Sequence, residues 1–290
     1  MANSLRAVKL RIDSTKSTAQ VTKAMYMVSQ SKVKRAETRY KNYKNFMKNI
    51  GDLVVSVVNS NHYEDEVHPM LKEREIMKVA YLIITSDRGL AGAYNSSVCK
   101  AFEEEIQSLN GKEYICSAIG KQGHNYLKSK NHPLILKEQI LVRDDVMFLD
   151  IVPLAKKVID LYLNKEIDQL VVIYNHYVNS LTQEIKKEVL LPISEINGEA
   201  SSVEYIYESG VLHTLDRILP MYVENMLYGI ILDAKTSEHS ARMNAMKSAT
   251  DNAKEVIDKL QILYNRARQD VITSELIDII GGANAIGGNN

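Results

Sequence analysis

The feature that most constrains the fold is a heptad repeat in the first fifth of the chain. Apolar and small residues recur there in alternating steps of three and four, from Leu5 to Val57. No proline precedes Pro69, and Gly51 is the only glycine in the run. This spacing is typical of a helix that packs along a partner helix. A single helix of some 55 residues would be about 80 Å long, which a compact domain cannot enclose.

The C-terminal segment carries a similar repeat. A first apolar stripe begins at Leu212, and spacings of three, four or seven continue beyond Pro220, the last proline. The repeat predicts a second long helix that the glycine-rich residues 281–290 end. The two helices flank one intervening region, so we expect them to pair as an antiparallel coiled coil. An ordinary helical bundle is the alternative, although the heptads run longer than bundle helices normally do.

The seam of this expected coiled coil contains many small residues. They permit close approach of the helices but bury little apolar area. Because each Å² of buried apolar area contributes roughly 25 cal/mol of stability, the seam is not built for maximum stability. The small seam positions are Thr15, Ala19, Thr22, Ser29, Ala241, Ala245 and Ala249.

The middle of the chain changes to a β-rich pattern. Short apolar runs at 77–85, 113–119, 133–140 and 168–178 alternate with helix-like segments at 95–109, 121–130 and 147–165. This alternation predicts a Rossmann-like α/β domain with a mainly parallel sheet and helices on both faces. Residues 182–193 follow the last run closely enough to pair with it antiparallel. The expected domains are a discontinuous coiled-coil shaft (1–60 and 210–290), a central α/β domain (75–195) and a connecting segment (196–209).

Composition excludes several classes of protein. The 290 residues are 45% hydrophobic and 25% charged, with no apolar stretch of 18 residues and no secretory signal, so we expect a soluble protein. Cys99 and Cys116 form no CxxC pair, and the histidines lack metal-ligand spacing, so we expect structural or free thiols and no metal. The zero net charge hides a segregation: residues 1–50 carry +10, residues 51–210 carry −8 and residues 211–290 carry −2.

One loop has the character of a ligand site. The sequence "TSDRGLAGAYN" (85–95) follows the first predicted strand, where open α/β sheets commonly bind ligands. Gly89 and Gly92 do not form a dinucleotide fingerprint, however, and no phosphate-binding P-loop occurs in the chain. No catalytic set can be assigned from residue spacing. We therefore expect no catalytic residue and no cofactor, and favour a structural turn in which Asp87 and Arg88 cap and pair while Gly89 and Gly92 bend the chain.

Four segments carry a family resemblance: "TKAMYMVSQSKVKRA" (22–36), the loop at 85–95, "ARMNAMKSATDNA" (241–253) and "RARQDVITSELIDIIGGANA" (266–285). With them the chain resembles, from end to end, the gamma subunit of F-type ATP synthases. This resemblance implies a non-catalytic rotor shaft, one copy per complex. The shaft would run through a ring of three alpha and three beta subunits, and its α/β domain would hold the epsilon subunit and the c-ring.

The resemblance also implies how the protein works. Ion flow turns the c-ring and the shaft, and the shaft drives the three catalytic beta subunits through successive conformations for ATP synthesis or hydrolysis, while regulating ATPase activity and ion flow. The protein would associate peripherally with a membrane through its complex. Because no transit peptide is apparent, we expect the cytoplasmic face of a bacterial cell membrane.

Two groups of residues match family positions with contacts outside the chain. The positions matched to contacts with beta, which has acidic loops nearby, are Lys23, Met25, Arg242, Gln269 and Thr273. The shaft tip, seated in an apolar collar of the ring, would comprise Ile279, Ile280, Ala283 and Ile286.

Two other functions compete with the shaft. A nucleic-acid binder could use the basic N-terminal helix, since lysines along a helix can follow phosphates. Against it, the basic residues share their helix with an unbroken heptad seam, and the remaining 240 residues have a net charge of −10. A Rossmann-like enzyme with helical appendages would instead need a bound nucleotide.

Overall fold

The computed structural model describes residues 2–59, 67–109, 111–194, 196, 198 and 210–287, without the side chains of 2–4 and 284–287. Most of the expected connecting segment, 196–209, and residues 288–290 therefore lie outside the described chain. The elements in order are α1 (Ala2–Asn59), β1 (Lys78–Ile84), α2 (Tyr94–Gln107), β2 (Glu113–Ile119), α3 (Lys121–Ser129), α4 (Phe148–Leu163), β3 (Gln169–Tyr177), β4 (Gln183–Leu191) and α5 (Val211–Gly287).

The sheet is mixed but mainly parallel, as predicted. Its strand order is β2-β1-β3-β4, and β1 pairs parallel with both β2 and β3, whereas β4 pairs antiparallel with β3. Near the carboxyl end of β1, Ile83 lies between Ala118 of β2 and Ile173 of β3. Long apolar runs such as "KVAYLII" suit β1, because a central parallel strand is buried on both faces.

The predicted strand at 133–140 is wrong. Leu134 and Ile140 form only isolated parallel bridges, to Cys116 and Ile119 of β2. Bends at 135 and at 137–138 interrupt the ladder between these bridges. The polar run "KEQ" at 137–139 supplies no apolar face that would hold this segment against the sheet.

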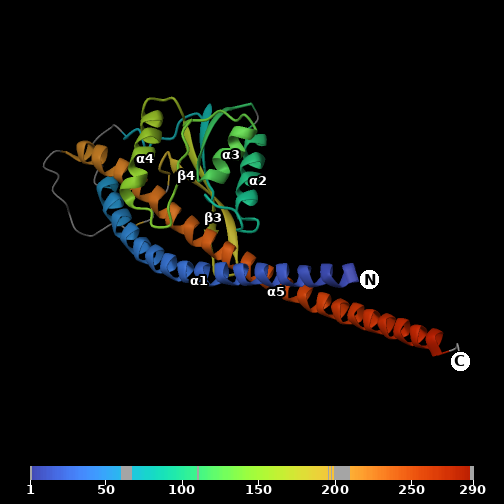
Figure 1. Ribbon diagram of the computed structural model, residues 1–290. Coiled ribbons are helices and arrows are strands. Elements are labelled where there is room, and N and C mark those ends of the chain that lie inside the picture. Colours follow the sequence, from blue (N-terminus) through green and yellow to red (C-terminus); the bar gives the residue numbers. More distant parts are fainter. Residues whose placement is uncertain are drawn as a thin grey trace. The chain divides into compact units, whose positions relative to one another are not determined.

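Helices cover both faces of the sheet (Figure 1), with α2 and α3 on one side and α4 on the other. Tyr81 and Ile83 of β1 pack in one apolar cluster with α2 and α3. Leu82 and Ile84 point to the opposite face and join a larger cluster with α4. Alternate residues of one strand therefore supply two separate cores.

The two long helices are confirmed, and α5 is longer than predicted. It passes through Gly281 and Gly282 and ends at Gly287. An exposed glycine costs a helix only about 1 kcal/mol, and no proline follows, so the glycines do not end the helix. Pro220 lies within α5, as its tenth residue.

The chain divides into two compact units, Ser29–Arg242 and Met1–Val28 with Met243–Asn290. In the first unit α1 and α5 are antiparallel, because Tyr40 donates a hydrogen bond to Asp233 (3.3 Å) whereas Tyr43 donates to Asn225 (2.7 Å). Their apolar residues, including Val54 of α1, belong to the same core as the second face of the sheet. These parts of the long helices are thus integral to the α/β domain.

In the second unit Thr22, one of the small residues predicted for the seam, contacts α5. Thr250 of α5 donates a hydrogen bond to Thr22 of α1, with an oxygen-to-oxygen distance of 2.8 Å. Ile12, Ala253 and Leu260 are buried in this unit. Short side chains and a hydroxyl pair let the two helices approach closely at this level.

Gly120→Ala should destabilise the protein strongly. Gly120 lies between β2 and α3 with a φ of 99°, and a Cβ there would lie 2.2 Å from the Thr85 carbonyl oxygen. Because backbone cannot move away as a side chain can, we expect the free energy of unfolding to fall by about 3 kcal/mol or more in urea titrations. Gly111→Ala is the control: its φ is 90°, but no atom lies within 4 Å of the added Cβ, so only strain of about 1 kcal/mol applies. Equal losses in both variants would contradict the clash.

Candidate functional site

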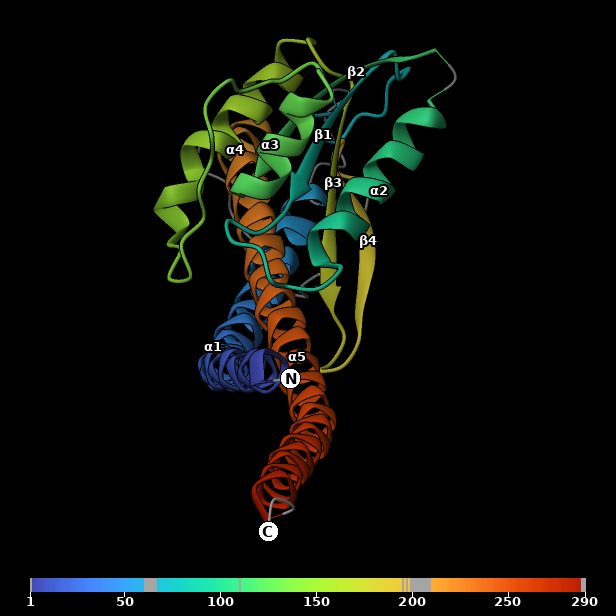
Figure 2. The same ribbon diagram turned by 45° about the vertical axis from the view of Figure 1, so that its right-hand side comes forward.

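The natural ligand crevice of this sheet is occupied by the protein's own helix. The chain leaves β1 through α2 on one face and reaches β3 through α4 on the other, so the carboxyl ends of β1 and β3 form the switch point where such sheets bind ligands. There Asp233 of α5 accepts a hydrogen bond from the Tyr177 amide (2.9 Å), and the Tyr94 hydroxyl donates to the Ala234 carbonyl (2.9 Å). Figure 2 shows α5 passing beside the ends of β3 and β4.

The part of α5 in this crevice, residues 233–242, is here called the junction segment. Every residue from 231 to 240 is buried, so the helix is enclosed on all sides at this level. Most of the enclosed side chains are polar or charged: Asp233, Lys235, Thr236, Ser237, Glu238, His239, Ser240 and Arg242. A buried polar segment is tolerated only where its groups find partners.

The β3–β4 turn and α1 supply some of these partners. The Ser240 hydroxyl donates to the Ser180 carbonyl at 2.7 Å. Asp233 Oδ2 accepts from Tyr40 of α1 and lies 2.5 Å from the His176 Nδ1. Burial raises the pKa of Asp233, and the contact with His176 opposes that rise.

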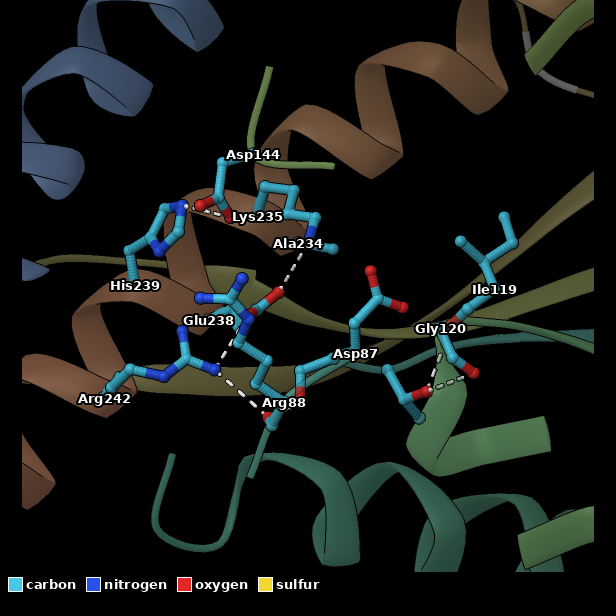
Figure 3. A network of polar contacts seen from close by, with 12 residues as sticks. Asp87, Arg88, Ile119, Gly120, Asp144, Ala234, Lys235, Glu238, His239 and Arg242 are labelled. Atoms are coloured by element: carbon cyan, nitrogen blue, oxygen red, sulfur yellow. Dashed lines mark hydrogen bonds and ion pairs between the residues drawn. The ribbon is translucent and has the colours of Figure 1, made fainter. Parts of the chain in front are cut away.

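A charge triad forms the centre of the junction segment (Figure 3). Glu238 accepts from Lys235 and from Arg242, each at 2.9 Å. Burial alone would raise the pKa of Glu238, but the two cations hold it below its usual value, so Glu238 is ionised. Removing one member of a buried ion pair typically costs 3–5 kcal/mol because it leaves an unpaired charge.

Arg242 also ties α5 to the loop at 85–95. Its guanidinium donates to the Arg88 carbonyl at 3.2 Å and approaches the Gly89 carbonyl at 3.5 Å (Figure 3). Arg242 is only 9% exposed, so its polar groups serve contacts within the chain. The Arg88 side chain, by contrast, is exposed, and Arg88 acts through its backbone.

The same loop closes the N-terminus of α3. The amides of the first three residues of α3 donate to three consecutive residues of the loop: Lys121 to Asp87 Oδ1 (3.1 Å), Gln122 to the Ser86 carbonyl (3.1 Å) and Gly123 to Thr85 Oγ1 (2.8 Å). A helix N-terminus binds phosphate through such amides. These amides are already engaged, so the N-terminus of α3 offers no phosphate site.

The bend of the loop depends on two left-handed residues. Gly92 has a φ of 58° and Leu90, 62% exposed, has a φ of 62°. Asn95 secures the base of the bend, because its Oδ1 accepts from the Ser86 amide at 2.9 Å. Gly89 has a negative φ and open space around it, so its conformation does not require glycine.

His239 connects the junction segment to the loop before α4. Its Nε2 lies 3.6 Å from Asp144 Oδ1 (Figure 3). Asp144 Oδ2 also accepts a hydrogen bond from Lys32 of α1 at 2.6 Å. Its Nδ1 is buried without a hydrogen-bond partner in the described structure. Burial lowers the pKa of His239 to about 4, so the ring is neutral at pH 7.

The remaining residues singled out in the sequence do not form one cluster. Lys23 is exposed and Met25 half-buried on α1, near the level of the Thr22–Thr250 contact. Gln269 and Thr273 are exposed about five helical turns further along α5. At the expected tip, Ile279 (67%), Ile280 (59%) and Ala283 are exposed; the side chain of Ile286 is outside the described residues.

Sequence reasoning missed the buried triad. Residues 235–242 read "KTSEHSAR", a stretch of α5 without one large apolar residue in a helix that otherwise carries an apolar stripe. This interruption was the available signal, since a buried polar stretch in a long helix indicates a polar surrounding rather than a helix seam.

The described residues contain no group of three or more potential metal ligands, and none of their helices is long and apolar enough to cross a membrane. Both cysteines are free and buried. Burial raises the pKa of Cys99 to about 11 and that of Cys116 to about 12, which makes both thiols unreactive at neutral pH.

The protein should lose stability as the pH falls from about 6.5 to 4. An unfolded chain protonates a histidine near pH 6.5, whereas folded His239 takes up a proton only near pH 4. In this window the unfolded state binds more protons, and the loss should approach about 3 kcal/mol in urea titrations at several pH values. His239→Gln should flatten this dependence, whereas His213→Gln, at an exposed position of α5, should leave it. A profile unchanged by His239→Gln would contradict the assignment.

Comparison with known proteins agrees with this architecture. A family profile described as ATP synthase matches residues 4–286. The chain is similar to a chain from the central stalk/c-ring of the Tetrahymena thermophila mitochondrial ATP synthase, with 28% identity, a TM-score of 0.61 and coverage of 79% of this chain and 99% of that one.

Two chains of the Euglena gracilis mitochondrial ATP synthase share the fold. One, from the OSCP/F1/c-ring in rotational state 3, has 17% identity and a TM-score of 0.70, covering 100% of this chain and 97% of that one. The other, from the rotor in rotational state 1, has 16% identity and a TM-score of 0.67, covering 94% and 100%. With the family match extending over nearly its whole length, the chain belongs to the gamma-subunit family of F-type ATP synthases.

Proposed function

We propose that this chain is the central shaft of an F-type ATP synthase, which turns with a c-ring and drives conformational change at catalytic sites on beta subunits. The observation that carries the proposal is the occupation of the ligand crevice by α5. The α/β domain grips a helix where a related enzyme would hold its substrate. The chain belongs to the gamma-subunit family, which is generally non-catalytic. This membership supports a mechanical role for the contact between the domain and α5.

The junction segment is suited to transmit torque. The hydrophobic effect is non-directional, whereas hydrogen bonds and ion pairs fix one rotational setting of a helix. The hydrogen bonds and ion pairs of Asp233, Glu238 and Arg242 are directional and buried. Rotating α5 within the domain would leave buried charges without partners, at a free-energy cost of several kcal/mol for each charge. The domain and the helix should therefore rotate together.

The far part of α5 calls for a surrounding partner. Its last described turns expose large apolar side chains that a free protein would rarely leave in water: Ile262, Leu263, Leu276, Ile277, Ile279 and Ile280, each between 53% and 69% exposed. We assign them to an apolar collar of an alpha3-beta3 ring, with Lys23, Met25, Gln269 and Thr273 facing beta. Arg242 could reach beta only by leaving Glu238, so its contact there is the costliest of the five.

The other proposed partners are an epsilon subunit and a c-ring, with one gamma chain per complex. The similar Tetrahymena chain belongs to a central stalk/c-ring assembly, which supports this setting. The F1 sector is peripheral to the membrane, and we place this chain at the cytoplasmic face of a bacterial cell membrane. Its free, unpaired cysteines suit a reducing compartment, and cell fractionation tests the location.

Mixing the chain with alpha and beta subunits should give a complex with one copy per six ring subunits and ATP hydrolysis that depends on it. Native mass spectrometry measures the stoichiometry, and a coupled assay measures steady hydrolysis.

Glu238→Gln, which leaves the two cations of the triad without their carboxylate, should assemble yet lower coupled ATP synthesis in reconstituted vesicles. Assembly of a fully active ring without the chain would overturn the shaft assignment.

Met25→Lys should impair coupling more than assembly. It adds a cation at a half-buried position two residues from Lys23, on a segment of α1 that we assign to acidic loops of beta, so it should strengthen contact there and slow rotation. The measured result would be a lower ratio of ATP synthesis to ATP hydrolysis. Met77→Lys, at a 64% exposed position before β1, is the charge-matched control away from this part of α1. Equal effects of both variants would remove Met25 from the beta contact.

A further inference from the structure

The first part of α1 carries a second heptad row besides the seam that faces α5. The row is offset by two positions from that seam and recurs in steps of three and four. None of its residues is charged: Ala7, Leu10, Ser14, Ser17, Val21, Ala24 and Val28. Because two residues span about 200° of a helix, this row lies nearly opposite the seam. The row is here called the outer face of α1.

The seam and the outer face differ in burial. Every seam residue from Leu5 to Ser29 is at least partly buried, whereas all seven residues of the outer face are exposed. Leu10, Val21 and Val28 are 62%, 59% and 56% exposed. A sustained heptad row of uncharged residues is typical of a helix that packs on another helix. In the described structure the contact with α5 uses only the seam, so the outer face is free to take a further helix.

The charges beside the outer face have one predominant sign. Lys9, Lys16 and Lys23 recur at every seventh position and therefore form a column along one side of it, and all three are exposed. Between residues 5 and 28 the chain has five lysines and arginines but a single carboxylate, Asp13. Long lysine side chains can lie along apolar surface while their ammonium groups reach acidic groups of a partner. A helix that packs here should therefore be acidic at its flanks.

An anionic membrane is the other surface that a basic helix with an apolar face can bind. Membrane-surface helices present a wide apolar face with large side chains such as Trp, Phe and Leu. The outer face is one heptad row wide, and four of its seven residues are alanine or serine. Small residues at heptad spacing suit the close approach of a second helix, so the pattern favours a helix over lipid.

We propose that the outer face of α1 binds an acidic amphipathic helix of a partner chain, with the carboxylates of that helix toward Lys9, Lys16 and Lys23. The contact would extend over residues 7–28, about 30 Å at 1.5 Å per residue. This inference deepens the proposed function, because the surroundings of the shaft would supply the helix. The contact with beta assigned to Lys23 and Met25 adjoins one end of this longer surface.

Fluorescence anisotropy of the full chain at low ionic strength tests the proposal with two labelled three-heptad peptides. Both peptides carry leucine at heptad positions a and d; one has glutamate at the flanking positions and the other has lysine. The glutamate peptide should bind at least about tenfold more tightly than the lysine peptide, and salt should weaken its binding. Equal binding of the two peptides would overturn the acidic assignment, and no binding of the glutamate peptide at millimolar concentration would overturn the site.

The double variant Val21→Gln/Val28→Gln should weaken binding of the glutamate peptide at least about tenfold, because two apolar contacts are lost. Both positions are exposed and glutamine is a better helix former than valine, so circular dichroism and melting temperature should stay at wild-type values. The matched control is Leu141→Gln/Leu149→Gln, at positions outside α1 that are 59% and 77% exposed. It should change the dissociation constant less than about twofold, within the usual range for distant surface substitutions.

Equal weakening in both double variants would show general adhesion to exposed apolar groups and would overturn the site. Binding of anionic phospholipid vesicles that Val21→Gln/Val28→Gln abolishes would assign the outer face to a membrane and overturn the helix. A chain that does not bind the glutamate peptide but still forms an active complex with alpha and beta subunits would overturn this inference alone and leave the shaft assignment.

Discussion

The structure depends on one buried ion pair network, in which Glu238 of α5 lies between Lys235 and Arg242. Without its cations the carboxylate would be an unpaired charge in the protein interior. Without the carboxylate, the two cations would be unpaired there instead. The network therefore fixes which residues of α5 can occupy the crevice and how the helix is rotated there. Arg242 extends this constraint to the loop at 85–95 through the Arg88 carbonyl. These directional contacts add to the constraint that apolar packing already places on the helix.

The loop at 85–95 joins α3 and α5 to the carboxyl end of β1. Thr85, Ser86 and Asp87 accept hydrogen bonds from the first three amides of α3, and Gly120 is required because Thr85 lies so close. The next residues of the loop turn their carbonyls toward α5. One short segment thus serves as cap for one helix and as contact for another, and it closes the crevice from both sides.

Much of the fold could be predicted from the sequence because long-range periodicity reports which face of an element is buried. The heptads of α1 and the β-rich runs of β1, β2 and β3 are of this kind. The strand predicted at 133–140 is absent because only Leu134 and Ile140 bridge to β2, with bends between them. An apolar run in the sequence does not distinguish two isolated bridges from a continuous ladder. The end of α5 was misplaced because exposed glycines weaken a helix without ending it. Arg242 belongs to a family motif and could be singled out from the sequence. Its partner Glu238 could not, because the pairing depends on which side chains are buried together when α5 occupies the crevice.

The capture of α5 has a consequence in terms of effective concentration. A free ligand occupies a crevice according to its concentration and dissociation constant, and it leaves at some rate. α5 is part of the same chain, so its local concentration is fixed by the fold and does not change with metabolite levels. It also cannot dissociate by a simple step, because Asp233, Glu238 and Arg242 would have to lose their partners together. The largest torque that this contact can carry is therefore set by the mechanical strength of the α/β domain itself.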